Sequence, residues 1–344
     1  MDSLTQVALG GAVGYAVLGS KVGRKAILWG AVLGTLPDLD VFLPYAGEVE
    51  AFTYHRGFSH SLLVHLLISP VITWLILRIH TQTQQYRKEW FYLVFLCLST
   101  HALLDSFTVY GTQLMWPLTE YPFGVSNLFI IDPLYTLPLL IGLLFALLPK
   151  IRPSTAKRMN TLGIVISSIY IAWSLGAKVL IDRKVEIAFQ QRNIDAIQYV
   201  STPAPFSTLL WRIVVMTNNQ YYEGYASVFD APEDIGLTPY QTRPELLETV
   251  NKEWAIMRLQ WFTKGFYSVS QRDNKIVLSD LRMGIECGYV FNFIVAEETE
   301  NSLQLALVEK FSERPDLGKI GNIWDRIWDP TIKLSPIKRE NECL

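Results

Sequence analysis

The chain has 344 residues, of which half are hydrophobic and only 18% are charged, and its formal net charge is −2. Charged residues make up about 25% of a typical soluble domain, so the composition excludes an ordinary soluble protein, and the charge gives no sign of a nucleic-acid partner. Long apolar runs gather in residues 1–181, whereas 182–344 has the composition of a soluble domain. The sequence therefore predicts a transmembrane domain at 1–181 followed by a soluble domain at 182–344.

Six apolar segments follow one another in the first domain. A membrane-spanning helix needs about 20 mostly apolar residues, within a range of about 17–25. The last five segments have this length. The first is shorter and glycine-rich, with Gly10 and Gly14 at a spacing that permits close helix contact, so it either spans or forms a re-entrant piece. We expect a polytopic α-helical membrane bundle of five to six spans, with segments at about 4–20, 26–44, 61–79, 90–108, 130–149 and 161–181.

Basic residues are distributed unevenly among the loops between these segments. The loops at 21–25, 80–89 and 150–158 are basic, whereas those at 45–60 and 109–129 carry three glutamates and one arginine. Because basic loops stay in the cytoplasm, we expect the C-terminal domain on the outer side of the membrane. Two basic residues that follow the last segment argue against this orientation.

The C-terminal domain has the pattern of an α+β fold. Two aromatic and β-branched stretches flank an Asn-Asn pair at 218–219, which predicts a hairpin. The stretch 244–265 is predicted to be helical, because it begins with a proline and ends near a glycine. Further strands are expected at 274–280, 287–298 and 302–311.

Two aspartates, Asp38 and Asp40, follow Pro37 near the end of the second segment. Proline disturbs a helix, and in an extended stretch residues two apart point to the same side. Neighbouring carboxylates repel each other in a low dielectric unless a cation lies between them. Both are therefore candidate metal ligands, and Asp38 is also a candidate general base. The alternative is a helix end that reaches headgroup water.

His101 and Asp105 are four residues apart in an apolar run that is predicted to be helical. This spacing places both side chains on one face. An aspartate in a membrane segment is costly and usually faces a cavity or a partner. Because imidazole and carboxylate both suit zinc, the pair predicts two ligands of one metal. The alternative is a hydrogen bond between the two side chains inside the bundle.

His55 and His60 flank a turn that Gly57 allows, and Ser59 is expected to cap the helix that follows. Both histidines are candidate ligands. An arginine beside a metal favours a bound anion as well, so Arg56 is predicted to bind a phosphate or carboxylate of the substrate. The alternative is a hydrated loop whose histidines have no role.

The predicted topology brings all these groups to one depth on the outer side. The second and fourth segments end there, and the third and fifth begin there, the fifth at Asp132, which joins Asp38 and Arg56 as a candidate catalytic residue. Histidine and aspartate without cysteine suit zinc, manganese or iron. Such a metal makes a nucleophile from water near neutral pH, and the number of ligands allows one or two ions.

The motifs that carry these residues resemble those of one known family. In order, they are similar to the motifs of the bacterial membrane-bound metal-dependent hydrolases of the YdjM type, also described as LexA-regulated inner-membrane hydrolases. The motifs are MDSLTQ at 1–6, PDLD at 37–40, HRGFSHS at 55–61, HALLD at 101–105, YGTQL at 110–114, FIIDPLYTLPLL at 129–140 and TPAPFSTLLWRIV at 202–214. The resemblance implies a bacterial inner-membrane protein whose metal ligands are Asp38, Asp40, His55, His60, His101 and Asp105. Many relatives carry a histidine at the position of Gln6.

The expected function is that of a membrane-bound metal-dependent hydrolase. It would use metal-activated water to cleave a phosphoester or other ester in a lipid or lipid-linked substrate. The phosphoester is favoured because the PDxD and HxxxD elements are also similar to those of zinc-dependent phospholipase C enzymes. Two alternatives stay open: a metal-stapled, non-catalytic assembly or regulatory protein, and an ion or metal transporter.

Overall fold

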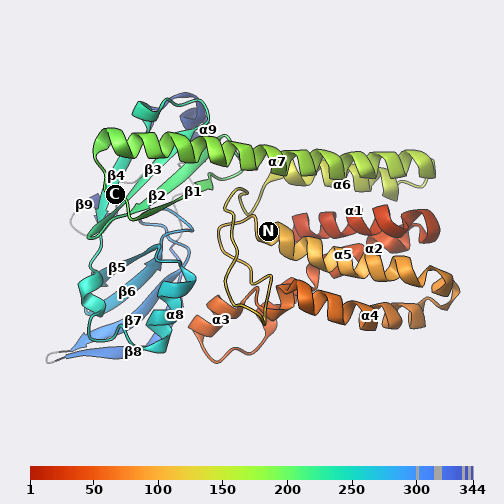
Figure 1. The fold of residues 1–344 in the computed structure, drawn as a ribbon, viewed down its shortest axis with the longest axis horizontal. Coiled ribbons are helices and arrows are strands. Elements are labelled where there is room, and N and C mark those ends of the chain that lie inside the picture. Colours follow the sequence, from red (N-terminus) through yellow and green to blue (C-terminus); the bar gives the residue numbers. More distant parts are fainter. Residues whose placement is uncertain (300–301, 314–319, 335–337, 340–341, 344) are drawn as a thin grey trace. The chain divides into compact units, whose positions relative to one another are not determined.

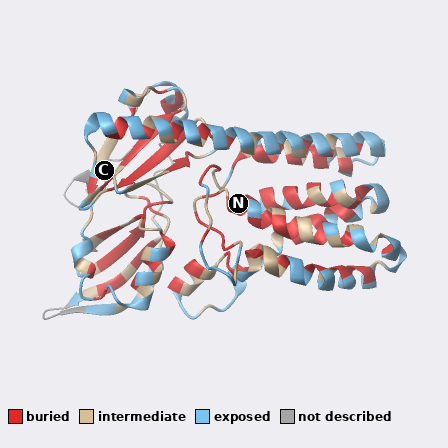
Figure 2. Cartoon of the chain, viewed as in Figure 1, coloured by how far each residue is buried: buried red, intermediate tan, exposed pale blue. Residues whose placement is uncertain are grey.

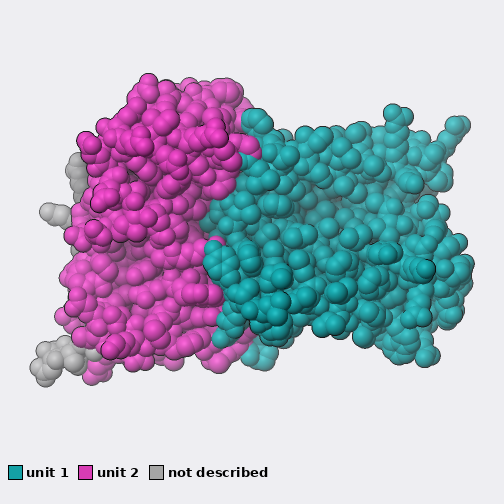
Figure 3. Space-filling view, in the orientation of Figure 1, with its two compact units in different colours: residues 1–44, 54–175 teal, residues 45–53, 176–344 magenta. Residues whose placement is uncertain are grey.

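Figure 1 shows the computed structural model of the chain, which describes residues 1–299, 302–313, 320–334, 338–339 and 342–343. The chain forms two compact units, distinguished by colour in Figure 3. Unit 1 contains residues 1–44 and 54–175, and unit 2 contains residues 45–53 and 176–344. The boundary between residues 175 and 176 lies inside a helix. Residues 45–53, here called the excursion, leave unit 1 and belong to unit 2, which the division predicted from composition did not include.

Unit 1 is a bundle of helices. Its α-helices are α1 (Ser3–Val22), α2 (Arg24–Thr35), α4 (Leu62–Ile79), α5 (Arg87–Asp105), α6 (Pro133–Leu147) and the first part of α7 (Pro153–Arg192). Three 3₁₀ helices connect them, η1 (Pro37–Phe42), η2 (Phe58–His60) and η3 (Thr81–Tyr86).

Glycines allow α1 and α2 to pack with their backbones in contact. A Cβ atom added to Gly10 would lie 2.2 Å from the carbonyl oxygen of Gly30, and one added to Gly14 would lie 2.4 Å from that of Ala26. No larger residue fits such an approach without a shift of one helix. The close helix contact that the spacing of Gly10 and Gly14 permits is therefore present, between α1 and α2.

The predicted bundle of five to six membrane spans is wrong. Among the described residues, two helices, α4 and α7, are long and apolar enough to cross a membrane, and Figure 2 shows that both are exposed along much of their length. The other apolar runs form helices that are too short or too polar. Pro37 ends α2 after 12 residues, Pro133 starts a 15-residue α6, and α5 begins with three charged residues. Glycines and polar residues dilute the apolar content of α1.

Unit 2 is built on two four-stranded antiparallel sheets in sequential strand order. The first contains β1 (Gln198–Pro203), β2 (Leu210–Met216), β3 (Gln220–Ser227) and β4 (Leu237–Gln241), and the second β5 (Tyr267–Arg272), β6 (Lys275–Asp280), β7 (Asn292–Thr299) and β8 (Ser302–Phe311). A two-stranded sheet pairs β9 (Lys338–Arg339) with β10 (Glu342–Cys343). The short helices are η4 (Pro232–Asp234), η5 (Pro244–Leu247), α8 (Trp254–Phe262) and α9 (Ile320–Trp328).

Several predictions for this part are confirmed and one is wrong. β2 and β3 form the expected hairpin, in which Leu210 pairs with Ser227. The expected strands appear as β6, β7 and β8. The expected helix at 244–265 is divided instead into η5 and the nine-residue α8, because the segment between them forms turns.

The excursion at 45–53 enters unit 2 through α3 (Glu48–Tyr54). Phe52 of α3 is 2% exposed, and its ring centroid lies 4.9 Å from that of Phe262, 4.7 Å from that of Phe291 and 5.1 Å from that of Phe293. This aromatic cluster holds the excursion in the core of the unit. The residues just before and after the excursion belong to the site described next.

Candidate metal site

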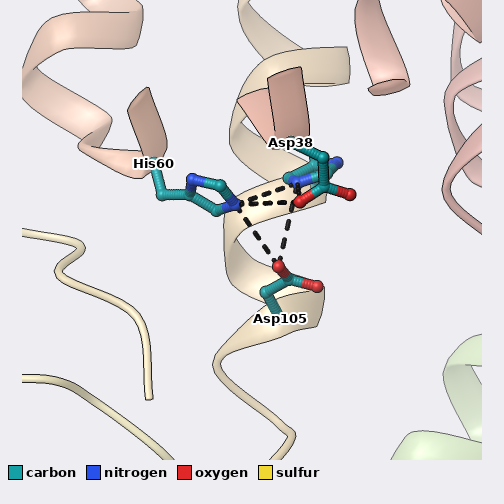
Figure 4. Close-up of side chains that lie close together, drawn as sticks. Asp38, His60 and Asp105 are labelled. Carbon is teal, nitrogen blue, oxygen red and sulfur yellow. Dashed lines mark hydrogen bonds and ion pairs between the residues drawn. The ribbon is translucent and has the colours of Figure 1, made fainter. Parts of the chain in front are cut away.

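Four side chains that are far apart in the sequence converge in unit 1 (Figure 4). They are Asp38 on η1, His60 on η2, and His101 and Asp105 on the last turns of α5, and one ligand atom from each lies within 4.8 Å of the others. The two residues on α5 share a face because they are four positions apart, as expected. Three of the four residues are buried.

The distances among the donor atoms suit a tetrahedral metal ion. His60 Nε2 lies 3.5 Å from Asp38 Oδ1 and 3.3 Å from Asp105 Oδ2. His101 Nε2 lies 3.3 Å and 3.8 Å from the same two oxygens. Four donors placed about 2.0–2.1 Å from a tetrahedral zinc ion lie roughly 3.3 Å from one another. The residues therefore fit one such ion with little movement.

Both histidines direct the same ring nitrogen into the cluster. The Nδ1 atom of His101 lies 2.6 Å from the carbonyl oxygen of Gly34, and that of His60 lies 2.9 Å from the hydroxyl of Ser59. The carbonyl can only accept, and the Ser59 hydroxyl donates to Asp40, so Nδ1 carries the proton in both rings. The Nε2 atoms, 3.1 Å apart, then face each other with lone pairs, an arrangement that a cation stabilises.

Asp105 is fully buried and receives contacts from distant parts of unit 1. Gln6 donates a hydrogen bond to its Oδ1 atom at 2.9 Å, and the amino nitrogen of Met1 contacts the same oxygen. Its Oδ2 atom faces the cluster, where it lies near His60 Nε2 and the Nε of Arg56. From the sequence, Gln6 is notable only as the residue at the position where many relatives carry a histidine, and nothing in the sequence indicates that it contacts Asp105.

Arg56 pairs with Asp105 and is 4% exposed. Its Nε lies 3.0 Å from Asp105 Oδ2, and its Nη1 donates to the hydroxyl of Thr108 at 3.1 Å. The backbone of Arg56 has a φ of 62°, and its amide and carbonyl are held by Asp40 and Gln113. A non-glycine residue in this region is strained and persists only where its surroundings fix it. Arg56 therefore places a fixed positive charge beside the cluster.

Neighbouring charges shift the pKa values of His60 and Asp38 in opposite directions. Burial opposes a positive charge on His60, but the carboxylates of Asp105 and Asp38 outweigh it and raise the pKa of His60. Burial also opposes a negative charge on Asp38, but the imidazoles of His101 and His60, when protonated at Nε2, outweigh it and lower the pKa of Asp38. A proton on His60 therefore competes with a metal for the same carboxylates.

Asp40 and His55 form a separate pair. Asp40 Oδ1 lies 2.7 Å from His55 Nδ1, and its Oδ2 accepts from the amide of Arg56 at 2.9 Å and from the hydroxyl of Ser59 at 2.6 Å. Asp40 thus reaches the cluster through Ser59, which contacts His60. The expectation that Ser59 caps the next helix is wrong, because Ser61 accepts the capping bond from Val64 in α4.

Asp132 lies at the start of α6 and acts there as a helix cap. Its Oδ1 atom accepts from the amides of Leu134 and Tyr135 at 3.1 and 3.3 Å, and its Oδ2 accepts from the hydroxyl of Tyr170 at 2.9 Å. Burial raises the pKa of Asp132. The structure does not place it in the four-residue group, so its catalytic role stays a prediction.

The four side chains differ in exposure. That of Asp38 is 25% exposed, whereas those of His60, His101 and Asp105 are fully buried. Three candidate ligands thus lie inside the protein, and the fourth is partly accessible to solvent. Catalytic metal sites keep an open position, whereas structural sites are closed.

Known proteins match this chain in the region that carries the site. Residues 1–181, just over half of the chain, match the YdjM inner membrane protein family. The chain is also similar to the uncharacterized protein YfhP of Bacillus subtilis strain 168, with 26% identity over 235 residues, which cover 65% of this chain and 68% of YfhP. No solved structure matches. The chain belongs to the YdjM inner membrane protein family.

Proposed function

We propose that the chain is a membrane-bound metal-dependent hydrolase. The observation that carries the proposal is the convergence of Asp38, His60, His101 and Asp105 around one position, with Asp38 partly exposed. Two imidazoles and two carboxylates suit zinc, with manganese or iron as alternatives. When bound, zinc lowers the pKa of a water molecule to about 7 and so supplies a nucleophile.

The chain's own residues prepare the site for this chemistry. Gly34 and Ser59 keep the protons of His101 and His60 on Nδ1, so that both Nε2 lone pairs face inward. Arg56 balances the charge of Asp105 and holds its inner oxygen in place. Such supporting residues fix the orientation and basicity of the ligands.

The partly exposed side chain of Asp38 supports catalysis over a purely structural metal. A structural ion that only joins helices is best held in a closed site of four ligands. Here one of the four side chains, that of Asp38, is 25% exposed, whereas a closed site would bury all four. We propose a phosphoester or other ester in a lipid or lipid-linked molecule as the substrate, because the site belongs to a membrane protein and a metal stabilises the charge that develops on phosphoryl oxygens.

Hydrolysis assays before and after removal of metal test this function. The detergent-purified protein is incubated with phosphodiester and phosphomonoester reporters and with phospholipids, first as purified, then after chelation, and then after addition of zinc or manganese. We expect activity that chelation abolishes and metal restores. His101→Ala should lack it, and the matched control His80→Ala, which changes a histidine outside the cluster, should keep it. Metal binding without hydrolysis of any substrate would favour the non-catalytic alternative.

We also propose that unit 2 faces the outer side of the inner membrane. Basic residues precede the apolar part of α7, which favours a cytoplasmic start of this helix. They are Lys150, Arg152, Lys157 and Arg158. A reporter that is active only outside the cytoplasm, fused at the C-terminus of the full chain, should be active. If a reporter that works only in the cytoplasm is active at the same position, unit 2 faces the cytoplasm and the proposed orientation is wrong.

A further inference from the structure

Three large aromatic side chains form an exposed cluster on unit 2, here called the aromatic patch. Phe229, Trp324 and Trp328 are 59%, 62% and 58% exposed. The rings of Phe229 and Trp328 stack with centroids 4.9 Å apart, and those of Trp324 and Trp328 meet edge to face at 6.1 Å. Isolated exposed aromatic residues are common on soluble proteins, but a cluster that exposes three of them together marks an interaction site.

The opposite face of α9 holds the patch rigidly. Arg326 is 2% exposed and forms two hydrogen bonds with Asp230, at 3.1 and 2.7 Å. Ile327 is 1% exposed and packs with the apolar cluster that includes Leu210 of β2. Because the helix is anchored on this side, Trp324 and Trp328, four residues apart, are directed away from the unit's interior.

Lys184 ties the patch to the end of the apolar part of α7. Its Nζ donates to the carbonyl oxygens of Val228 at 2.8 Å and of Asp230 at 2.6 Å, the two neighbours of Phe229. One turn earlier, Val179 and Leu180 are 52% and 42% exposed on the same helix. With a rise of 1.5 Å per residue, Lys184 lies about 6 Å beyond Leu180 along the axis of α7.

If α7 spans a bilayer, as its length and composition allow, this position is where the interface is expected. A helix that crosses a membrane passes from exposed apolar residues to headgroup level within a turn or two, and tryptophan is enriched there because its ring is apolar and its N–H is polar. Arg183, next to Lys184, is exposed and adds a positive charge suited to phosphate headgroups. The aromatic patch therefore combines the side chains, the level and the neighbouring charge of a membrane-interface anchor.

We propose that the aromatic patch inserts into the headgroup region of the bilayer that α7 crosses, and so holds unit 2 against the membrane surface. The contact does not depend on the metal site. It adds to the protein a second attachment to lipid, made by α9 and the turn after β3. The competing occupant, another protein, would cover the same residues in the absence of lipid and is separated from the proposal by the experiment.

Spin labels on the full chain in vesicles test the proposal. Phe229, Trp324 and Trp328 are each replaced by cysteine and labelled with a nitroxide, and Leu307→Cys, at an exposed position of β8 in the same unit, is the matched control. In phosphatidylcholine–phosphatidylglycerol vesicles, we expect the three patch labels to collide with a water-soluble nickel chelate several-fold less often than the control label, and with oxygen more often.

Lipids that carry a paramagnetic group on the headgroup complete the test. When they are added to the vesicles, the spectra of the three patch labels should broaden, whereas the spectrum of the label at position 307 should not. Equal nickel collision rates at all four positions, in variants whose unfolding temperature matches that of wild type, would overturn the proposal. Protection from nickel without any response to paramagnetic lipid would overturn it as well, in favour of a protein partner.

Discussion

The Nε2 atoms of His60 and His101 lie 3.1 Å apart, although the two residues are separated by 41 positions in the chain. Each ring uses Nδ1 to donate a hydrogen bond, so the two facing nitrogens present lone pairs to each other and to two carboxylates. A cation at this point removes the repulsion and binds all four groups.

Ser59→Ala should weaken metal binding without removing a ligand. The hydroxyl links His60 to Asp40, and loss of such an outer hydrogen bond typically lowers metal affinity about 10–100-fold. Competition with a chromogenic chelator measures the dissociation constant. Ser168→Ala, at an exposed serine of α7, is the control and should bind metal as wild type does. Equal affinity of both variants would show that Ser59 does not orient His60.

Metal affinity should fall as the pH is lowered. Nearby carboxylates raise the pKa of His60, so a proton begins to compete with the metal at a higher pH than it would at an ordinary histidine, whose pKa is about 6.5. Protonation can only weaken metal binding, because the metal requires the unprotonated Nε2 and displaces its proton. Calorimetric titration with zinc between neutral and mildly acidic pH measures it. An affinity that does not change over this range contradicts the assigned ligand.

Asp132→Ala should lower stability and leave metal binding intact. The carboxylate caps α6, and loss of a cap typically costs about 0.5–2 kcal/mol of the free energy of unfolding. Asp132→Asn keeps an accepting oxygen and should cost less. Thermal unfolding in detergent, followed by metal analysis, measures both properties. Loss of hydrolysis in both variants at full metal content and normal stability would instead support the catalytic role predicted from the sequence.

Gly30→Val should disrupt the contact between α1 and α2. A Cβ atom at this position would lie 2.2 Å from the carbonyl oxygen of Gly10, so one helix has to move, at a cost of about 1–3 kcal/mol or more. Gly176→Ala is the control, because nothing lies within 4 Å of its added Cβ and alanine favours a helix by about 1 kcal/mol. The unfolding temperature should fall in the first variant and stay or rise in the second. A stable Gly30→Val protein would contradict the packing.

Phe52→Ala should destabilise unit 2, although Phe52 lies between two segments of the site. Removing a buried phenylalanine costs about 3–5 kcal/mol, and this ring contacts three others. Leu307→Ala, at a position that is 93% exposed, should change stability by less than about 0.5 kcal/mol. Denaturant unfolding of the two variants measures the difference. Similar curves for both would place α3 outside the core of unit 2.

The sequence predicted the family. Three of the four motifs that were expected to meet do meet, although Asp132 is not in the four-residue group and the predicted membrane topology behind the expectation is wrong. The i, i+4 spacing of His101 and Asp105 is reliable because α5 is a regular helix. Asp38 and Asp40 were expected on one side of an extended stretch. Pro37 instead starts a 3₁₀ helix, in which residues two apart are about 240° apart around the axis, so Asp40 turns towards His55.

Other features depend on contacts that a local pattern does not contain. Apolar runs predict membrane spans, but Pro37 ends α2 after 12 residues and Pro133 begins an α6 of only 15. Arg56 was predicted to bind a substrate anion, and that stays a prediction. Its pairing with Asp105 depends on a backbone conformation that only the surrounding loop fixes.

The metal content of the purified protein tests the central claim most directly. Elemental analysis is made of wild type, His60→Ala and Asp105→Ala, with His80→Ala as the control, after each is shown to be folded. We predict about one zinc, manganese or iron ion per chain in wild type and control, as a single four-ligand site requires, and none in the other two variants. Wild-type protein that binds no metal even when metal is supplied, or variants that retain it, would contradict the account.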